Sequence, residues 1–299
     1  MKQGVWVKLF LVVTAACFVS ASAVAQTTMP IRVDRYDDAD DYLPEMERKN
    51  TSGIRLFLRQ QEGENLVKVL SPRNVTVDVI ERIPESADFG VVFLLGGTSV
   101  LSIQNEKLDR SFSFHSRSRD YWWEQKAATF LVDAPSDRLD KAGIEDARWR
   151  SGRDHQVDLK AVLDSIAQRF KGPLVVHGHS NGALSVANIA ALNHPAVRAF
   201  VYSSGSHYKR PTTIIYDTAH QAPVIFVQHK NDTCRVSATE VFEQFTERVK
   251  APSKTVLVVD GGVAAMSGAC GGFAPHSFVG MEREVINQQI PLIRQALAQ

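Results

Sequence analysis

The segment Gly178-His179-Ser180-Asn181-Gly182 has the spacing of a serine-nucleophile motif, G-x-S-x-G. It follows the continuous apolar run Leu174–His177 and precedes the small, helix-favouring residues Ala183–Ala187. A sharp turn from a buried strand into a helix holds such a serine in a strained conformation, and the flanking glycines let strand and helix approach closely. A chance match is the alternative, but this context favours Ser180 as a nucleophile.

A serine hydroxyl needs a neighbouring base, and that base needs a carboxylate that fixes its tautomer. In the chain order serine, acid, histidine, the acid should follow a later strand, and Asp232 comes soon after the apolar run Val224–Gln228. His276 lies between the apolar run Thr255–Val259 and the last helical pattern. The order therefore predicts Asp232 as the orienting acid and His276 as the general base.

Other residues could fill these two roles. Asp260 ends the last apolar run and is the alternative acid, although the glycines after it favour a turn. Asp232 itself could be a turn aspartate that bonds its own backbone. Among the nine histidines, His177 and His179 flank the serine motif, and we expect them to shape the pocket or to fill a polar core position.

The negative oxygen of a tetrahedral intermediate requires two backbone N–H donors. Asn181, directly after the serine, supplies one from the start of a helix. The second should come from the loop that follows Val91–Leu95, which begins Gly96-Gly97-Thr98-Ser99. By position we predict Thr98, with Gly97 as the second choice, and an ordinary tight turn is the alternative.

All these residues follow short apolar runs that alternate with helical patterns. Such runs are typical of strands buried on both faces of a parallel sheet, and they are Val91–Leu95, Thr129–Val132, Leu174–His177, Ala199–Ser203, Val224–Gln228 and Thr255–Val259. The helical patterns cover Arg119–Lys126, His155–Phe170, Ala183–Leu192, Ala238–Val249 and Phe278–Ala298. Upstream, partly alternating runs predict half-exposed antiparallel strands at Ile54–Arg59, Leu66–Leu70 and Val75–Ile83. This order predicts a doubly wound α/β sheet with ligands bound beyond the carboxyl ends of its strands.

From about Ile54 to the C-terminus the sequence resembles the α/β-hydrolase superfamily. The resemblance rests on the order of the Gly96-Gly97 loop, the Ser180 motif, Asp232 and His276. It implies a mostly parallel eight-stranded sheet with helices on both faces, antiparallel N-terminal strands and acyl-enzyme chemistry. The chain departs from the pattern in two ways. Many esterases carry His-Gly where this chain has Gly96-Gly97, and only residues 206–223 separate the sixth and seventh strands, too few for a helical cap.

The N-terminus has the features of a secretory signal peptide over residues 1–25, with an early lysine, an apolar stretch and the cleavage signature Ala23-Val24-Ala25. Lipoprotein processing at Cys17 is the alternative. Cleavage near Ala25 predicts a secreted or periplasmic protein, with a polar lead-in over 26–52 and a catalytic domain over 53–299. No later stretch is long enough to span a bilayer, so we expect no stable membrane anchor.

The charge is nearly balanced, with 34 lysines and arginines against 33 acidic residues, which gives no reason to expect a nucleic-acid partner. The basic, aromatic segment Arg110–Arg119 is interpreted as a partly solvated loop. Arg117 and Arg119 could bind a substrate carboxylate, but solvated arginines are the commoner case. The aromatic residues Tyr121, Trp122 and Trp123 are expected in the core rather than in a pocket. The sequence does not indicate the oligomeric state.

After loss of the signal peptide, only Cys234 and Cys270 remain. Exported proteins with two cysteines tend to pair them. Cys234 lies close to Asp232, and Cys270 lies close to His276, so the two cysteines must meet if the acid and the base meet. We predict a disulfide beside the site, with two separate buried thiols as the alternative.

Together these residues predict a serine hydrolase that cleaves a small-molecule carboxylic ester through an acyl-enzyme on Ser180. The same residues would serve a thioesterase or an acyltransferase. A non-catalytic ligand-binding protein of the same fold is a further alternative. The predicted chemistry needs no metal and no organic cofactor, and we expect neither.

Overall fold

The structure is a computed structural model that describes residues 28–30, 33–36, 58–61, 63–101, 103–104, 107–108, 113–140, 142–205 and 213–299. The predicted signal peptide, with Cys17, lies outside these residues. Most of the expected strand Ile54–Arg59 also lies outside them. Its last two residues belong to β3 (Leu58–Gln61), which pairs with β2 (Val33–Tyr36) in a separate small sheet.

The main sheet contains nine strands among the described residues, in the order β1-β4-β5-β9-β6-β10-β11-β12-β13. The pairs from β9 to β13 are parallel, whereas β1, β4 and β5 pair antiparallel with their neighbours, as predicted for the N-terminal strands. The strands are β1 (Thr28–Pro30), β4 (Asn65–Leu70), β5 (Thr76–Arg82), β9 (Ala127–Pro135), β6 (Phe89–Leu94), β10 (Leu174–His179), β11 (Val197–Ser203), β12 (Val224–His229) and β13 (Lys254–Val259).

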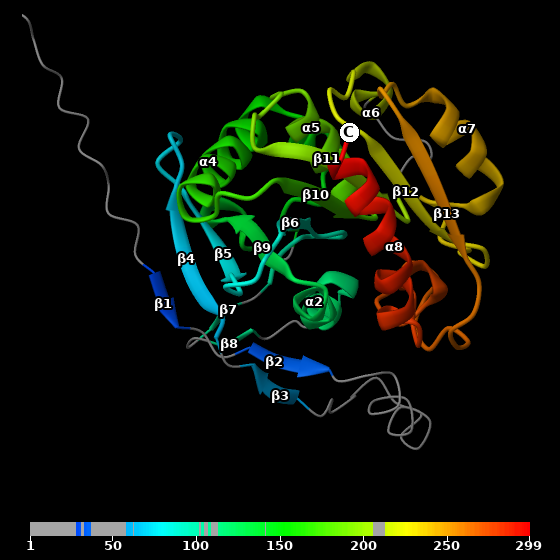
Figure 1. Cartoon of the computed structure of the whole chain (residues 1–299), viewed down its shortest axis with the longest axis horizontal. Coiled ribbons are helices and arrows are strands. Elements are labelled where there is room, and N and C mark those ends of the chain that lie inside the picture. Colours follow the sequence, from blue (N-terminus) through cyan, green and yellow to red (C-terminus); the bar gives the residue numbers. More distant parts are fainter. Residues whose placement is uncertain are drawn as a thin grey trace, which may run out of the picture.

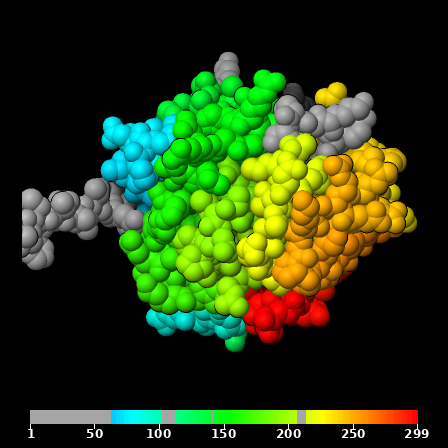
Figure 2. Space-filling model, turned by 90° about the horizontal axis from the view of Figure 1, so that it is seen from above, coloured from blue at the N-terminus to red at the C-terminus, as the bar shows by residue number. Residues whose placement is uncertain are grey.

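Eight of these strands form the predicted mostly parallel sheet, and β1 adds a short ninth. It pairs through Thr28↔Val67 to Pro30↔Asn65 and so occupies the outer edge of β4, where unpaired backbone groups would otherwise face solvent. Figure 2 shows β4 and β5, in cyan, and β13, in orange, toward opposite ends of the molecule, as this strand order requires.

Helices cover both faces of the sheet (Figure 1). On one face, α4 (Arg153–Arg169), α5 (Gly182–Ala190), α6 (Ile214–Asp217) and α7 (Phe242–Arg248) contribute to a core with the inward side chains of the central strands. On the other face, α2 (Phe114–Glu124) and α8 (Glu282–Leu297) contribute to a second core. The completely buried strands β6, β9, β10 and β12 lie between these two cores. Continuous apolar runs are needed for this arrangement because both faces of each strand are covered.

Helix α2 differs most from the expectation. It begins at Phe114, capped by the Ser113 side chain, which accepts a hydrogen bond from the Ser116 N–H. The segment was expected to be a partly solvated loop, but its described part from Phe114 to Arg119 is helical and buried. Acidic partners far along the chain explain this burial, because a charged side chain enters a core only when it is paired.

Those partners are Glu282 for Arg117, at 2.8 Å, and Glu64 for Arg119, at 2.6 Å. Neither arginine is therefore a solvated side chain. Tyr121 and Trp122 are buried in the core as expected, and Trp123 donates from Nε1 to the Thr129 hydroxyl at 2.7 Å.

The remaining elements are short. The chain forms β7 (Ile103–Gln104) and β8 (Lys107–Leu108), the helix α3 (Ala147–Arg150), and the 3-10 turns η1 (Ser136–Arg138), η2 (Thr239–Val241) and η3 (Pro275–Ser277). Between β11 and β12 the described residues form the one-turn helix α6. Within the described part of the chain, no helix combines the length and the apolarity needed to cross a membrane.

Candidate active site

Ser180 lies at the turn between β10 and α5 with φ of +53°. This left-handed conformation costs energy for a residue other than glycine and is found where a structure aims a functional side chain. The flanking glycines allow the turn. A Cβ at Gly178 would overlap Val186 of the following helix, and a Cβ at Gly182 would overlap the Leu94 carbonyl of β6. The strand–turn–helix geometry that the motif predicts is therefore present.

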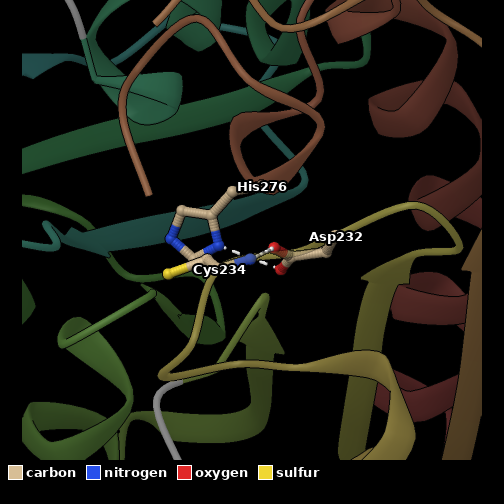
Figure 3. Close-up of side chains that lie close together, drawn as sticks. All are labelled: Asp232, Cys234 and His276. Carbon is tan, nitrogen blue, oxygen red and sulfur yellow. Dashed lines mark hydrogen bonds and ion pairs between the residues drawn. The ribbon is translucent and has the colours of Figure 1, made fainter. Parts of the chain in front are cut away.

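Asp232 and His276 come together from the loops after β12 and before α8. The Nδ1 atom of His276 lies 2.9 Å from Oδ2 of Asp232, and both side chains are almost completely buried (Figure 3). The alternative acid, Asp260, is exposed and pairs with Lys230 at 3.0 Å. The acid that the structure brings to the histidine is thus Asp232.

The Asp232 carboxylate accepts three further hydrogen bonds. Its Oδ1 accepts from the backbone N–H of Cys234 at 2.8 Å, as a turn aspartate does. Its Oδ2 accepts from the Ser237 hydroxyl at 2.8 Å and from the Gln228 amide at 3.1 Å. The turn interpretation and the catalytic interpretation of Asp232 are therefore compatible, because one oxygen holds the loop while the other faces the histidine.

His276 and Ser180 share one cavity of about 170 Å³, lined by Gly96, Gly97, Ser113, His179, Ser180, Cys270, Gly272, His276 and Ser277. The Nε2 atom of His276 is buried and has no hydrogen-bond partner among the described residues. Ser180 and His276 are thus not hydrogen-bonded to each other here, and such contacts commonly tighten only when substrate binds. The arrangement leaves Nε2 available to accept a proton inside the cavity.

The loop after β6 lies against the candidate nucleophile. Gly97, with φ of +53°, lines the cavity and has open space at its Cα. Thr98 is not among the lining residues. Its Oγ1 accepts from the Val100 N–H at 3.4 Å, and its carbonyl accepts from the Ile144 N–H at 2.9 Å. Gly97, the second choice from the sequence, thus lines the cavity, whereas Thr98, the first choice, does not. Asn181, directly after Ser180, is the N-cap of α5.

A buried arginine holds this loop. The guanidinium of Arg150, at the end of α3, donates from Nη2 to the Gly97 carbonyl at 2.8 Å and to the Ser99 hydroxyl at 2.9 Å. Its Nη1 donates to the Ser185 hydroxyl at 3.0 Å. Because the Gly97 carbonyl is bound on the side of α3, the loop backbone has a fixed orientation next to Ser180. No sequence pattern indicates this role, since α3 is only one turn long.

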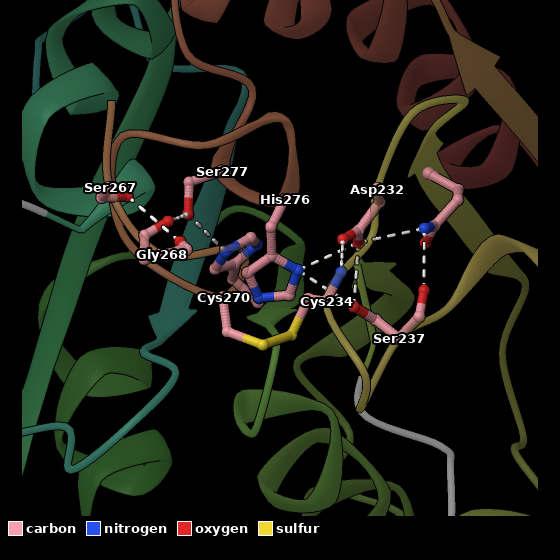
Figure 4. Close-up of a disulfide and its surroundings, with 11 residues drawn as sticks. Asp232, Cys234, Ser237, Ser267, Gly268, Cys270, His276 and Ser277 are labelled. Atoms are coloured by element: carbon pink, nitrogen blue, oxygen red, sulfur yellow. Dashed lines mark hydrogen bonds and ion pairs between the residues drawn. A yellow bond between two sulfur atoms is a disulfide. The ribbon is translucent and has the colours of Figure 1, made fainter. Parts of the chain in front are cut away.

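A disulfide joins Cys234 to Cys270 across a separation of 36 residues (Figure 4). It links the loop that carries Asp232 to the loop that carries His276, and Cys270 forms part of the cavity wall. The predicted pairing is therefore present, and the alternative of two separate thiols is wrong.

The same disulfide bears on metal binding. Ligand atoms of Asp232, Cys234 and His276 lie within 4.8 Å of one another, close enough for a metal site (Figure 3). However, thiolate sulfur is the form of cysteine that binds metals, and the Cys234 sulfur is bonded to Cys270. This set of donors does not fit a metal ion.

The histidines beside the serine motif belong to a buried polar cluster. His179 lines the cavity and lies within hydrogen-bond distance of the Ser203 and Ser277 hydroxyls, at 3.3 and 3.2 Å. His177 lies inside the core, 2.8 Å from His115. Burial lowers the pKa of His179 well below its usual value and that of His177 to about 4. Both rings are therefore neutral near pH 7. His179 shapes the pocket, and His177 fills a polar core position.

The histidine loop is also held from α2. Arg117 donates from Nη2 to the Ser277 carbonyl at 2.5 Å, directly after His276. Its guanidinium lies 5.5 Å from the ring centre of Phe273. This role of Arg117 differs from the expectation of a partly solvated loop, because the residue lies on a buried helix. The sequence signal that could have revealed this role is the helical spacing of the arginine among the aromatic residues of its segment.

Comparisons with known proteins identify the fold. The chain is similar to the Pyrococcus furiosus esterase Pf2001, with 16% identity, 79% of this chain and 91% of that chain covered, and a TM-score of 0.54. It is similar to the dienelactone hydrolase of Anabaena variabilis, with 14% identity, coverage of 79% and 96%, and a TM-score of 0.53. A third similar structure is XC6422 of Xanthomonas campestris, described as an α/β serine hydrolase without a lid, with 14% identity, coverage of 77% and 97%, and a TM-score of 0.50.

No protein-family model and no curated protein sequence matches the chain. At these identities the structural likeness concerns the fold. The protein has the α/β-hydrolase fold, as the sequence resemblance implied.

Proposed function

We propose that this protein is a serine hydrolase that cleaves a carboxylic ester of a small molecule, with Ser180 as nucleophile, His276 as general base and Asp232 as orienting acid. The observation that carries the proposal is the shared cavity. It holds a strained serine at a strand–helix turn and a histidine whose Nδ1 is bound to a buried carboxylate while its Nε2 has no hydrogen-bond partner among the described residues. The esterase and hydrolase names of proteins with the same fold support it.

In this mechanism the Ser180 Oγ attacks the carbonyl carbon of the ester while Nε2 of His276 accepts the hydroxyl proton. The N–H groups of Asn181 and Gly97 stabilise the developing oxyanion, with Thr98 N–H as the alternative second donor. The histidine then gives its proton to the departing alcohol, which leaves an acyl group on Ser180. Water, deprotonated by the same nitrogen, attacks the acyl carbon. The histidine then returns this proton to the Ser180 Oγ as the acyl–oxygen bond breaks, which releases the acid and restores the serine.

The experiment that tests the proposal combines a fluorophosphonate label with a panel of esters of increasing acyl length. The wild-type protein should be labelled at Ser180 and should hydrolyse at least one ester. Ser180→Ala should abolish both the labelling and the turnover while the fold, measured by circular dichroism, stays intact. Labelling at a different serine, or full turnover by Ser180→Ala, would refute the assignment.

Thioesterase and acyltransferase activities would use the same residues, so thioesters and acceptor alcohols belong in the panel.

A non-catalytic binding protein of this fold is the second candidate. It would bind an ester without turnover and would resist the fluorophosphonate, because no base would activate the serine.

We also infer that the protein is exported. The signal-like segment over residues 1–25 and the disulfide support this inference, because disulfides persist in oxidising compartments. Cell fractionation and mass measurement of the mature protein test it. Cleavage near Ala25 is expected, a lipid attached to Cys17 would indicate the alternative processing, and an uncleaved protein in the cytoplasm would contradict export.

A further inference from the structure

Ser237 contacts both the candidate acid and the candidate base. Its hydroxyl oxygen lies 2.8 Å from Oδ2 of Asp232 and 2.9 Å from Nδ1 of His276 (Figure 4). The residue is completely buried. Its backbone is fixed as well, because its N–H donates to the Cys234 carbonyl at 3.0 Å and its carbonyl accepts from the Gln228 amide at 3.0 Å.

The Ser237 hydroxyl has a single proton, so it can donate in only one of these two contacts. An ionised carboxylate only accepts hydrogen bonds, so the Ser237 hydroxyl donates its proton to Asp232. The hydroxyl can then only accept from His276, and Nδ1 must carry a hydrogen. The opposite tautomer would place an unprotonated Nδ1 at 2.9 Å from a carboxylate oxygen without a proton between them. Two acceptors therefore face the Nδ1–H group from neighbouring directions.

We propose that Ser237 is a positioning residue of the active site, which shares the Nδ1–H hydrogen with Asp232 and fixes the orientation of the His276 ring. The inference rests on the proposed function. A ring held by two acceptors has little freedom to rotate about χ2, so Nε2 keeps one orientation in the wall of the cavity shared with Ser180. The serine acts through the histidine and touches no reacting atom.

Ser237→Ala removes the hydroxyl and leaves the backbone bonds in place. A hydrogen bond to a charged group has an energy that corresponds to a change in rate of about 10- to 100-fold. We expect kcat for an ester to fall by that factor, KM to stay within about twofold, and the rate of fluorophosphonate labelling at Ser180 to fall in parallel. Ser237→Thr keeps the hydroxyl and should recover most of the loss.

Ser204→Ala is the matched control. Ser204 is also completely buried, and its hydroxyl has no hydrogen-bond partner among the described residues. Its replacement should leave kcat and the labelling rate unchanged. A Ser237→Ala protein that is less stable but keeps the wild-type kcat would overturn the proposal, since that is the result of a purely structural role.

A measurement on the unmodified protein covers the case in which Ser237→Ala does not fold. Nitrogen-15 spectra of labelled histidine should show His276 as the Nδ1–H tautomer with a proton resonance at low field. Protonation at Nε2 instead would overturn the proposal. Failure of the proposed function is distinguishable, because the wild-type protein would then show neither turnover nor labelling, or Ser180→Ala would keep full activity, whatever the result at Ser237.

Discussion

Gly96 packs directly against Ser180, and a Cβ at Gly96 would lie 2.8 Å from the Cβ of the serine. The backbone of the loop after β6 thus forms one wall of the nucleophile turn. The strand before Gly96 and the helix after Ser180 hold these two residues in position. A side chain on Gly96 has no free space.

Gly96→Ala should therefore displace Ser180 or the loop beside it. A displacement of about 1 Å at a reacting group costs about 100-fold in rate, and we expect kcat and fluorophosphonate labelling to fall by about that factor. Gly268→Ala is the control, because a Cβ there meets no atom within 4 Å. Equal activity of Gly96→Ala and Gly268→Ala would show that Gly96 and Ser180 are not in close contact.

Arg150→Met should weaken the loop that carries Gly97 by removing three hydrogen bonds to Gly97, Ser99 and Ser185. We expect kcat to fall about tenfold or more with little change in KM, because the oxyanion donor loses its support. Arg148→Met in the same helix is the control, since Arg148 is exposed. If Arg150→Met keeps the wild-type kcat, the loop is held by other contacts.

The disulfide should contribute about 4 kcal/mol to the free energy of unfolding, by the chain-entropy estimate for a loop of this length. The double variant Cys234→Ser, Cys270→Ser should unfold at a lower denaturant concentration and turn over ester more slowly, because the acid and base loops lose their link. Thiol titration of denatured, unreduced wild-type protein should detect no free thiol in the mature chain. Detection of two free thiols would show that the bridge does not form.

Acid should destabilise the protein through its buried histidines. Burial lowers the pKa of both His177 and His220 to about 4, from 6.5. On acidification, these histidines therefore bind protons near pH 6.5 in the unfolded chain but only near pH 4 in the folded protein. The stability that the two neutral histidines contribute is complete above pH 6.5 and is lost as the pH falls toward 4. Each histidine should lower the free energy of unfolding by about 1.4 kcal/mol per pH unit within this window.

Two variants should change this dependence in opposite directions. His220→Gln should make urea-unfolding stability less dependent on pH between 4 and 6.5. Asp133, whose pKa burial raises to about 7, contributes stability at low pH that is lost as the pH rises. Asp133→Asn should therefore make the loss of stability on acidification steeper. If stability changed with pH in the same way in the wild type and in both variants, neither His220 nor Asp133 would be responsible for the pH dependence.

The sheet could be predicted from the sequence because its strands are continuous apolar runs. Such runs have few other ways to be buried, and their order placed Ser180 after β10, Asp232 after β12 and His276 between β13 and α8. The Cys234–Cys270 bridge followed from the same placement. These predictions depend on local composition and chain order, which a single sequence displays directly.

The parts that could not be predicted depend on partners far apart in the chain. Arg117 looked like a solvated side chain, since its acidic partner Glu282 lies 165 residues away. Ser237 carries no motif, and its role appears only when the loops of Asp232 and His276 meet. The placement of Gly97 and Thr98 is a similar case, because the turn of the backbone, rather than the position in the chain, decides which residue lines the cavity.

The contacts of helix α2 determine when the molecule acquires its complete site during synthesis. Arg117 is made 160 residues before Ser277, whose carbonyl it binds next to His276. The pairing of Arg117 with Glu282, the first residue of α8, therefore forms only after nearly the whole chain has been made. The bridge to Cys234 also forms only in an oxidising compartment. Under the proposed function and the proposed export, a newly made chain is thus expected to be less active inside the cell than at its destination.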